Sequence, residues 1–176
     1  VNENLLFRYL LGCTKDNKER AYLLNHYLEE FRGTVYRQVM FAEFEKKSHA
    51  LMEEGGAVTA EGLNDMYYAL NQEYFGGAVK VDKEIALEWA RIPHFYSSFY
   101  VYKYATGFSA AVALAEGILS GDQGKISAYR DFLKSGGSDY PLELLKRAGV
   151  DLTKPKPVQQ ALDIFKKNVE LLESEF

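Results

Sequence analysis

Glycine pairs and prolines divide this sequence into stretches whose apolar residues recur at helical spacing. The pairs at 55–56 and 76–77 are typical of residues that end a helix, and Pro93 disfavours a helical conformation for the residue before it. No stretch alternates apolar and polar residues as a half-buried strand does. The sequence therefore predicts an all-α fold. The clearest apolar seam lies in the last stretch and consists of Leu162, Phe165, Val169 and Leu172.

The order of the expected helices follows from their capping residues. Asp16 and Thr59 are residue types that cap a helix, and Pro141 and Pro157 suit its first turn. Because there is no flexible linker or internal repeat, we treat residues 1–176 as a single helical region. The expected helices cover residues 2–11, 16–54 with a bend near Gly33, 59–74, 82–91, 94–119 and 122–133, then a short helix from Pro141 to Gly149 and a last helix from Pro157.

Charge and composition exclude several classes of protein. The 21 basic residues are scattered among 25 acidic ones, so the clustered positive charge of a nucleic-acid-binding surface is missing. The longest uncharged segment, residues 104–115, is shorter than the roughly 20 residues that cross a bilayer, so we expect no membrane association. The single cysteine, Cys13, fits a reducing compartment, and the first residues do not resemble a signal peptide. We expect a cytoplasmic protein with 47% hydrophobic residues in a substantial core.

The three histidines do not form a zinc motif. None has the spacing of His-Glu-x-x-His, which places two imidazoles on one face of a helix. Glu45 with His49, and His26 with Glu30, lie four residues apart, so each pair could face one metal ion. A zinc site usually needs three protein ligands, and a solvated or salt-bridging pair explains this spacing equally well. We therefore expect no metal site in this chain.

Residues 89–107 combine a histidine with closely spaced tyrosines. In the expected helix over 94–119, His94 lies at the positive end, where a neutral imidazole is favoured. Tyr96, Tyr100 and Tyr104 recur every four residues, so they would stack along one face. A neutral histidine beside phenols is a set of hydrogen-bond donors suited to a carbonyl oxygen that gains negative charge. Packing in a core or an interface explains the same spacing, and the pattern alone leaves both interpretations open.

Two long strings of residues resemble a known family. Residues 32–45 and 89–107, in this order, are similar to oligoendopeptidase F and its relatives, zinc metallopeptidases related to thimet oligopeptidase. The resemblance implies an all-helical, deep-channelled peptidase that hydrolyses short, unstructured peptides. It also implies a zinc ion held by a His-Glu-x-x-His helix and a downstream Glu, with the motif Glu as general base. Shorter agreements, which extend the resemblance along the chain, are His49 with Glu53 and residues 74–76, 132–136, 141–146 and 148–151.

The same resemblance places the zinc ligands outside this sequence. Asn2-Glu3 matches an Asn-Glu pair that follows the third ligand in the family, so this ligand would lie just before Val1. Glu3 is then no ligand, although it could support the metal site. We expect the C-terminal part of a larger peptidase catalytic domain, with zinc in the full-length enzyme, no cofactor in this fragment and no activity of the fragment alone. Its partners would be a short peptide substrate and the missing N-terminal part of the same chain, and exposed apolar surface would favour self-association.

The resemblance also assigns roles to the His and Tyr residues of the second string. His94 matches the family histidine that stabilises the tetrahedral intermediate, and Tyr100 and Tyr104 match the phenols that act with it. Tyr96 and Tyr102 are expected to bind substrate. The alternative function is a non-catalytic helical module that binds peptides or other proteins through the tyrosines.

Overall fold

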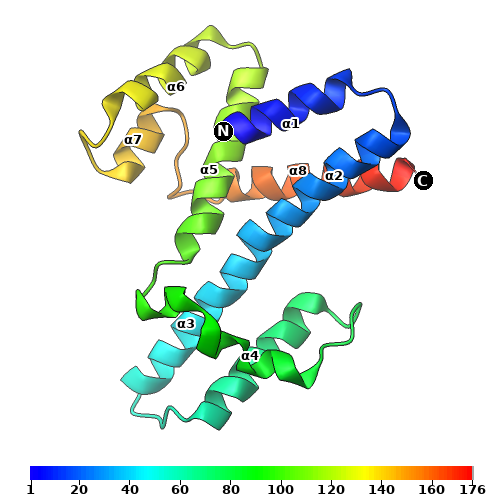
Figure 1. Cartoon of the computed structure of the whole chain (residues 1–176). Coiled ribbons are helices and arrows are strands. Elements are labelled where there is room, and N and C mark those ends of the chain that lie inside the picture. The colour runs from blue at the N-terminus through cyan, green and yellow to red at the C-terminus, as the bar shows by residue number, and fades with distance from the viewer. Residues whose placement is uncertain (176) are drawn as a thin grey trace. The chain divides into compact units, whose positions relative to one another are not determined.

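The chain consists of helices joined by short loops (Figure 1). The computed structural model describes residues 1–175, and this part of the chain contains no strand, which confirms the all-α prediction. No helix in it is long and apolar enough to span a membrane. The α-helices are α1 (Asn2–Cys13), α2 (Asn17–Phe31), α3 (Arg37–Glu53), α4 (Ala60–Phe75), α5 (Tyr102–Leu119), α6 (Gln123–Ser135), α7 (Pro141–Arg147) and α8 (Lys156–Ser174).

Contacts divide the chain into two compact units. Unit 1 comprises Val1–Arg32 and the chain from Thr106 onward, and unit 2 comprises Gly33–Ala105. Near the boundary the expected bend at Gly33 is a short π-helix, η1 (Arg32–Tyr36), between α2 and α3. Such a turn inserts an extra residue into an α-helix and so interrupts its regular hydrogen bonding.

Unit 1 is built around the packing of α2 against α8. Asp16 caps α2 as predicted, because its carboxylate accepts a hydrogen bond from the backbone N–H of Glu19 at 3.0 Å. Phe31 is fully buried, and its ring centroid lies 4.7 Å from that of Phe165 on α8. The apolar seam predicted for the last helix therefore contributes to this core. The side chain of Asp122 likewise caps α6.

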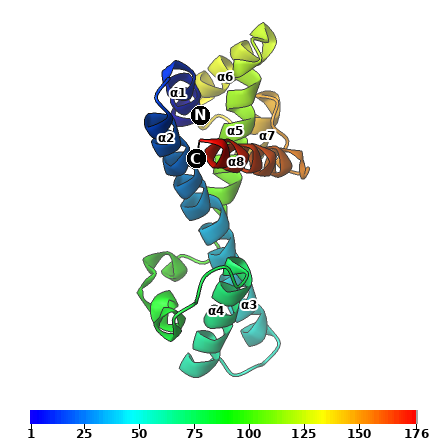
Figure 2. The same cartoon turned by 90° about the vertical axis from the view of Figure 1, so that its right-hand side faces the viewer.

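Unit 2 packs α4 against α3 and against a short 3₁₀-helix, η2 (Lys83–Arg91); α3 and α4 can be followed in two views (Figure 1, Figure 2). Thr59 caps α4 through a bond from the Gly62 N–H at 3.1 Å, as predicted. The buried core takes residues from α3, from α4 and from the segment that follows η2, and the partly buried Ile85 and Trp89 of η2 pack against it. Its members are Met40, Phe41, Phe44, Tyr67, Leu70, Ile92 and Val101.

The prediction of one long helix over 94–119 is wrong. Pro93–Tyr96 forms a single 3₁₀ turn, η3, residues 97–101 are irregular, and α5 begins only at Tyr102. Within the irregular segment Phe99 has a positive φ of 56°, which a helix cannot contain. Val101 is fully buried, so core packing draws the chain inward at this point. The helix expected over 82–91 is present over Lys83–Arg91, but with 3₁₀ rather than α geometry.

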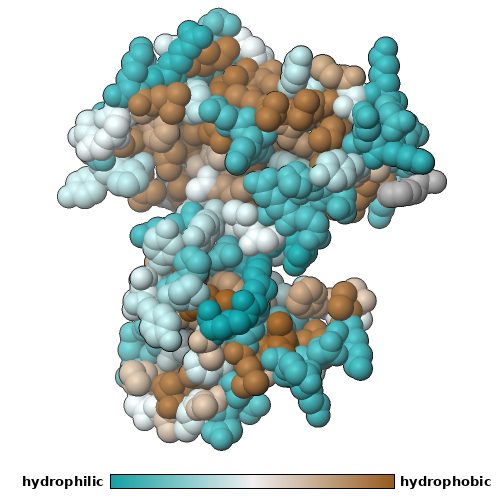
Figure 3. All heavy atoms as spheres, viewed as in Figure 1, coloured by the Kyte–Doolittle hydropathy of each residue, from teal (hydrophilic) through white to brown (hydrophobic). Residues whose placement is uncertain are grey.

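Large apolar side chains remain exposed on both units. Figure 3 shows hydrophobic residues, in brown, reaching the surface on the viewed face. The exposed fractions of Leu6 and Leu133 in unit 1 and of Leu87 in unit 2 are 56%, 62% and 61%. Scattered apolar residues are normal on a protein surface, but larger contiguous patches mark places where other surfaces bind.

Candidate functional site

His94 lies in the η3 turn of unit 2, between the buried Ile92 and the irregular segment 97–101. Pro93 starts this turn, because its fixed φ suits the first helical position. The Nε2 atom of His94 lies 3.1 Å from the hydroxyl of Tyr104, which belongs to the first turn of α5. Residues ten positions apart in sequence thus share one hydrogen bond.

Tyr100 completes a cluster with these two residues. Its ring stacks on the ring of His94 with centroids 5.7 Å apart and an interplanar angle of 20°. It also meets the Tyr104 ring edge-on, at 5.7 Å and 78°. Offset stacks and edge-on contacts at these distances are favourable aromatic geometries. His94, Tyr100 and Tyr104, called the His–Tyr cluster below, therefore lie together within one compact unit.

The arrangement differs from the expected row on a helix face. Tyr96 is 86% exposed on the η3 turn, and it is absent from the stacked rings of the cluster. Tyr102, at the start of α5, is 48% exposed. The helical spacing of Tyr96, Tyr100 and Tyr104 is therefore not the reason for the contact, since no helix runs through all three. Tyr100 and Tyr104 meet because the irregular segment leads directly into α5.

The electrostatic argument for His94 changes with the fold. This histidine lies within a four-residue 3₁₀ turn and not at the start of a long helix, so the helix-dipole effect expected from the sequence has no structural basis. For Tyr104, a hydrogen bond with Tyr100 raises the pKa of the phenol above its ordinary value of 10. Tyr104 consequently keeps its proton at neutral pH. The cluster offers hydrogen-bond donors and contains no nucleophile.

Glu45 and His49 do not face a shared metal ion. The Glu45 carboxylate accepts a hydrogen bond from the backbone N–H of Phe99. His49 Nδ1 lies 2.7 Å from the backbone carbonyl oxygen of Glu45, and its ring packs against Phe99 with centroids 4.6 Å apart. Residues 1–175 contain no group of three or more His, Cys, Asp or Glu side chains that could hold a metal ion. The residues present therefore do not fit a zinc ion, which usually has three or four protein ligands.

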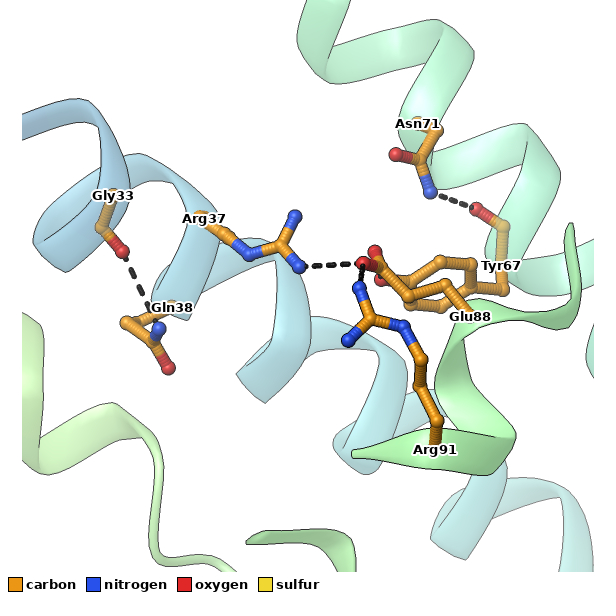
Figure 4. Close-up of polar contacts among 7 residues, drawn as sticks. All are labelled: Gly33, Arg37, Gln38, Tyr67, Asn71, Glu88 and Arg91. Carbon is orange, nitrogen blue, oxygen red and sulfur yellow. Dashed lines mark hydrogen bonds and ion pairs between the residues drawn. The ribbon is translucent and has the colours of Figure 1, made fainter. Parts of the chain in front are cut away.

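The buried carboxylate of Glu88 on η2 was not predicted from the sequence. Glu88 is 8% exposed and accepts hydrogen bonds from Arg37 of α3 and Tyr67 of α4, each at 2.7 Å, and a third from Arg91 (Figure 4). Burial alone would raise the pKa of Glu88, but the bonds from Arg37 and Tyr67 outweigh it and hold the pKa below its usual value. These contacts hold η2 against α3 and α4. They thereby also position the chain that leads from η2 into His94. Nothing in the spacing of these residues reveals the contact, because 51 positions separate Arg37 from Glu88.

A shallow groove of about 510 Å³ lies beside this carboxylate in unit 2. Its walls include Phe75, Ile85 and Arg91, and no member of the His–Tyr cluster lines it. The groove is therefore separate from the candidate site. Its mixed apolar and charged lining does not define one ligand class.

Comparisons with known proteins agree over nearly the whole chain. The sequence profile described as peptidase family M3 matches residues 1–164. "Oligopeptidase PepF" of Bacillus subtilis (strain 168) is 52% identical over 173 residues, which are 98% of this chain and 26% of that protein. The chromosomal "Oligoendopeptidase F" of Lactococcus lactis subsp. cremoris is 48% identical over 98% of this chain and 29% of its own length.

A solved structure gives the same result. The crystal structure of oligoendopeptidase-F from Enterococcus faecium matches with a TM-score of 0.96 and 49% identity. The match covers 99% of this chain and 33% of that one. The present chain thus spans about a quarter to a third of the length of these relatives.

Proposed function

The chain belongs to peptidase family M3, and from this premise we propose that it is the C-terminal part of a zinc-dependent oligoendopeptidase that hydrolyses short peptides. Relatives at 46–52% identity are named oligopeptidases or oligoendopeptidases, which supports this activity for the full-length protein. The chain covers at most 31% of the curated relatives' length, so the proposed catalytic domain needs residues from outside it. A short peptide and the remainder of the same protein are the proposed partners.

The role proposed for this chain rests on the 3.1 Å contact between His94 Nε2 and the Tyr104 hydroxyl, with Tyr100 stacked on His94. During peptide hydrolysis the carbonyl oxygen gains negative charge as the tetrahedral intermediate forms. Donors fixed in advance stabilise that charge more strongly than the neutral carbonyl, and this difference lowers the barrier. We assign this role to the donors of the His–Tyr cluster, and we assign substrate binding to the more exposed Tyr96 and Tyr102.

The metal would be held elsewhere in the full-length protein. Peptidases of family M3 are generally zinc-dependent, whereas the described residues of this chain do not fit a zinc ion. Zinc in such enzymes activates a water molecule for attack. The isolated 176-residue chain is therefore expected to contain no stoichiometric zinc and to leave peptides uncleaved. A cytoplasmic location remains a prediction from the sequence.

The proposed role is tested with Tyr104→Phe in the full-length peptidase, assayed on a fluorogenic peptide. Loss of one donor to the developing oxyanion is expected to lower kcat by about 100- to 1,000-fold while KM changes little. Tyr140→Phe is the matched control, because Tyr140 is 81% exposed and belongs to unit 1. An unchanged kcat for Tyr104→Phe would leave the cluster with a packing role only.

A peptide-binding module without catalysis is the second candidate. The exposed fractions of Tyr96, Phe99 and Tyr100 are 86%, 47% and 40%, so aromatic surface is available for contact with a peptide. In that case, substitutions in the cluster would weaken peptide binding, and the unsubstituted full-length protein would bind peptides without hydrolysing them. Peptide turnover by the full-length protein separates the two functions.

A further inference from the structure

Glu45 of α3 is a buried acidic side chain that the proposed chemistry does not use. It is 3% exposed, although carboxylates are rarely buried unless they are paired or hydrogen-bonded. Its carboxylate accepts a hydrogen bond from the backbone N–H of Phe99, 54 positions away in sequence. The bond joins α3 to the irregular segment 97–101, and both belong to unit 2.

Phe99 needs such a partner, because its backbone is unfavourable on its own. A φ of 56° is the left-handed region, which a bulky residue such as phenylalanine rarely adopts. Strained backbone of this kind persists only where the surrounding contacts fix it. The described residues contain no other non-glycine position with a positive φ.

His49 also contacts Phe99, through its side chain. Its ring packs against the Phe99 ring at a centroid distance of 4.6 Å. Its Nδ1 atom lies 2.7 Å from the carbonyl oxygen of Glu45, so the imidazole orientation is fixed by the helix that also carries the carboxylate. One turn of α3 thus contacts both the backbone and the side chain of Phe99.

The conformation of Phe99 decides where the His–Tyr cluster lies. Tyr100 is the next residue and stacks on His94, and the fully buried Val101 leads into α5, where Tyr104 meets His94. If the chain continued as a helix through 97–101, Tyr100 and Tyr104 would still lie on one face, but His94 would lie about 15 Å from Tyr104 along the helix axis and could not reach its hydroxyl. We infer that Glu45 is a positioning residue: its carboxylate, by holding the Phe99 N–H, keeps His94, Tyr100 and Tyr104 together. The catalytic side of this inference rests on the proposed function.

The test uses Glu45→Ala in the full-length peptidase, with two readouts. Hydrogen–deuterium exchange measures the loop directly, and exchange over residues 97–101 is expected to be about 10- to 100-fold faster, as the loss of a charge-assisted hydrogen bond implies. Peptide hydrolysis measures the consequence: kcat is expected to fall by at least about tenfold with a smaller change in KM, because misplaced donors weaken transition-state binding more than substrate binding.

Three further variants keep the test decisive. Glu45→Gln retains an oxygen acceptor and is expected to restore both readouts to within about threefold of the unsubstituted enzyme. Glu45→Asp keeps the charge but shortens the side chain, so it is expected to resemble Glu45→Ala even if the latter fails to fold. Glu53→Ala is the control, because Glu53 is exposed on the same helix.

Each outcome decides the inference. Unchanged exchange over residues 97–101 in both Glu45→Ala and Glu45→Asp would overturn it. So would faster exchange with an unchanged kcat, provided that Tyr104→Phe is impaired in the same assay. If Tyr104→Phe itself turns over normally, the proposed function fails, and the exchange readout still decides whether Glu45 holds the loop.

Discussion

At the scale of single residues, the protonation of Tyr104 matters most for the proposed chemistry. A phenol donates a hydrogen bond to a developing oxyanion only while it keeps its proton. The hydrogen bond with Tyr100 raises the pKa of Tyr104 above 10, so the donor is preserved throughout the neutral range. Lys103, whose Nζ lies 5.1 Å from the centre of the Tyr100 ring, adds a cation–π contact to the same group.

The raised pKa of Tyr104 gives a prediction with a definite sign. The protonated phenol is favoured in the folded chain, so its stabilising contribution is present below pH 10 and is lost as the pH rises through the folded-state pKa. Tyr100→Phe removes the hydrogen bond and is expected to lower the pKa of Tyr104. NMR titration of ring-labelled tyrosine in the full-length protein measures this pKa, with Tyr140→Phe as a control. An unchanged value in Tyr100→Phe would contradict the assigned cause.

At the scale of elements, Glu88 fastens η2 to two helices of unit 2. Its carboxylate is shared by Arg37 of α3, Tyr67 of α4 and Arg91. Arg37 and Arg91 reach solvent, but removing Glu88 would leave the buried Tyr67 hydroxyl without its acceptor, which costs more than removing an exposed charge. The stability of unit 2 is therefore expected to depend on this one side chain.

Glu88→Ala is expected to lower the free energy of opening of unit 2 by about 1–3 kcal/mol, because it leaves the buried Tyr67 hydroxyl without its acceptor. The depressed pKa of Glu88 means that its contribution is present above pH 4.5 and is lost as the pH falls through the folded-state pKa. Hydrogen exchange of peptides from α3 and α4 in the full-length protein measures this free energy. Glu84→Ala, an exposed change on the same 3₁₀-helix, is the control. If Glu88→Ala lowered the free energy of opening no more than Glu84→Ala does, the stabilising role of Glu88 would be contradicted.

Local signals were enough to predict most elements. Asp16 and Thr59 cap α2 and α4 as expected, because a capping side chain acts within its own first turn. The break before α5 was missed, since it depends on a bond between Phe99 and Glu45, 54 positions apart. Spacing carries no information about such tertiary contacts, and a helix pattern can be overridden by them.

The sequence predicted part of the candidate site, but one of the two arguments for it was wrong. His94, Tyr100 and Tyr104 do lie together, but the helical row that led to them does not exist. The family resemblance named the same three residues without any assumption about local geometry, because it compares whole strings of residues, and the roles that it implies stay predictions. Glu88 was not singled out and Glu45 was considered only as a possible partner of His49, since burial of a carboxylate cannot be inferred from the sequence when its partners are distant.

At the scale of the whole molecule, the chain is expected to associate with itself when it is made alone. It spans about a quarter to a third of the relatives' length, and apolar side chains such as Leu6 and Leu133 are exposed. Apolar surface that another part of a protein would cover tends to find another partner. Gel filtration of the 176-residue chain is expected to show oligomers whose proportion rises with concentration. A monomer at all concentrations would contradict this expectation.

The central claim is that this chain supplies donors, and no metal ligand, to the active site of a larger peptidase. The most direct test is His94→Ala in the full-length protein, with zinc content and kcat measured on the same sample. The account predicts that zinc is retained while kcat falls by about 100-fold or more. If zinc is lost together with activity, His94 belongs to the metal site, and if kcat is unchanged, it has no catalytic role; either result would contradict the claim.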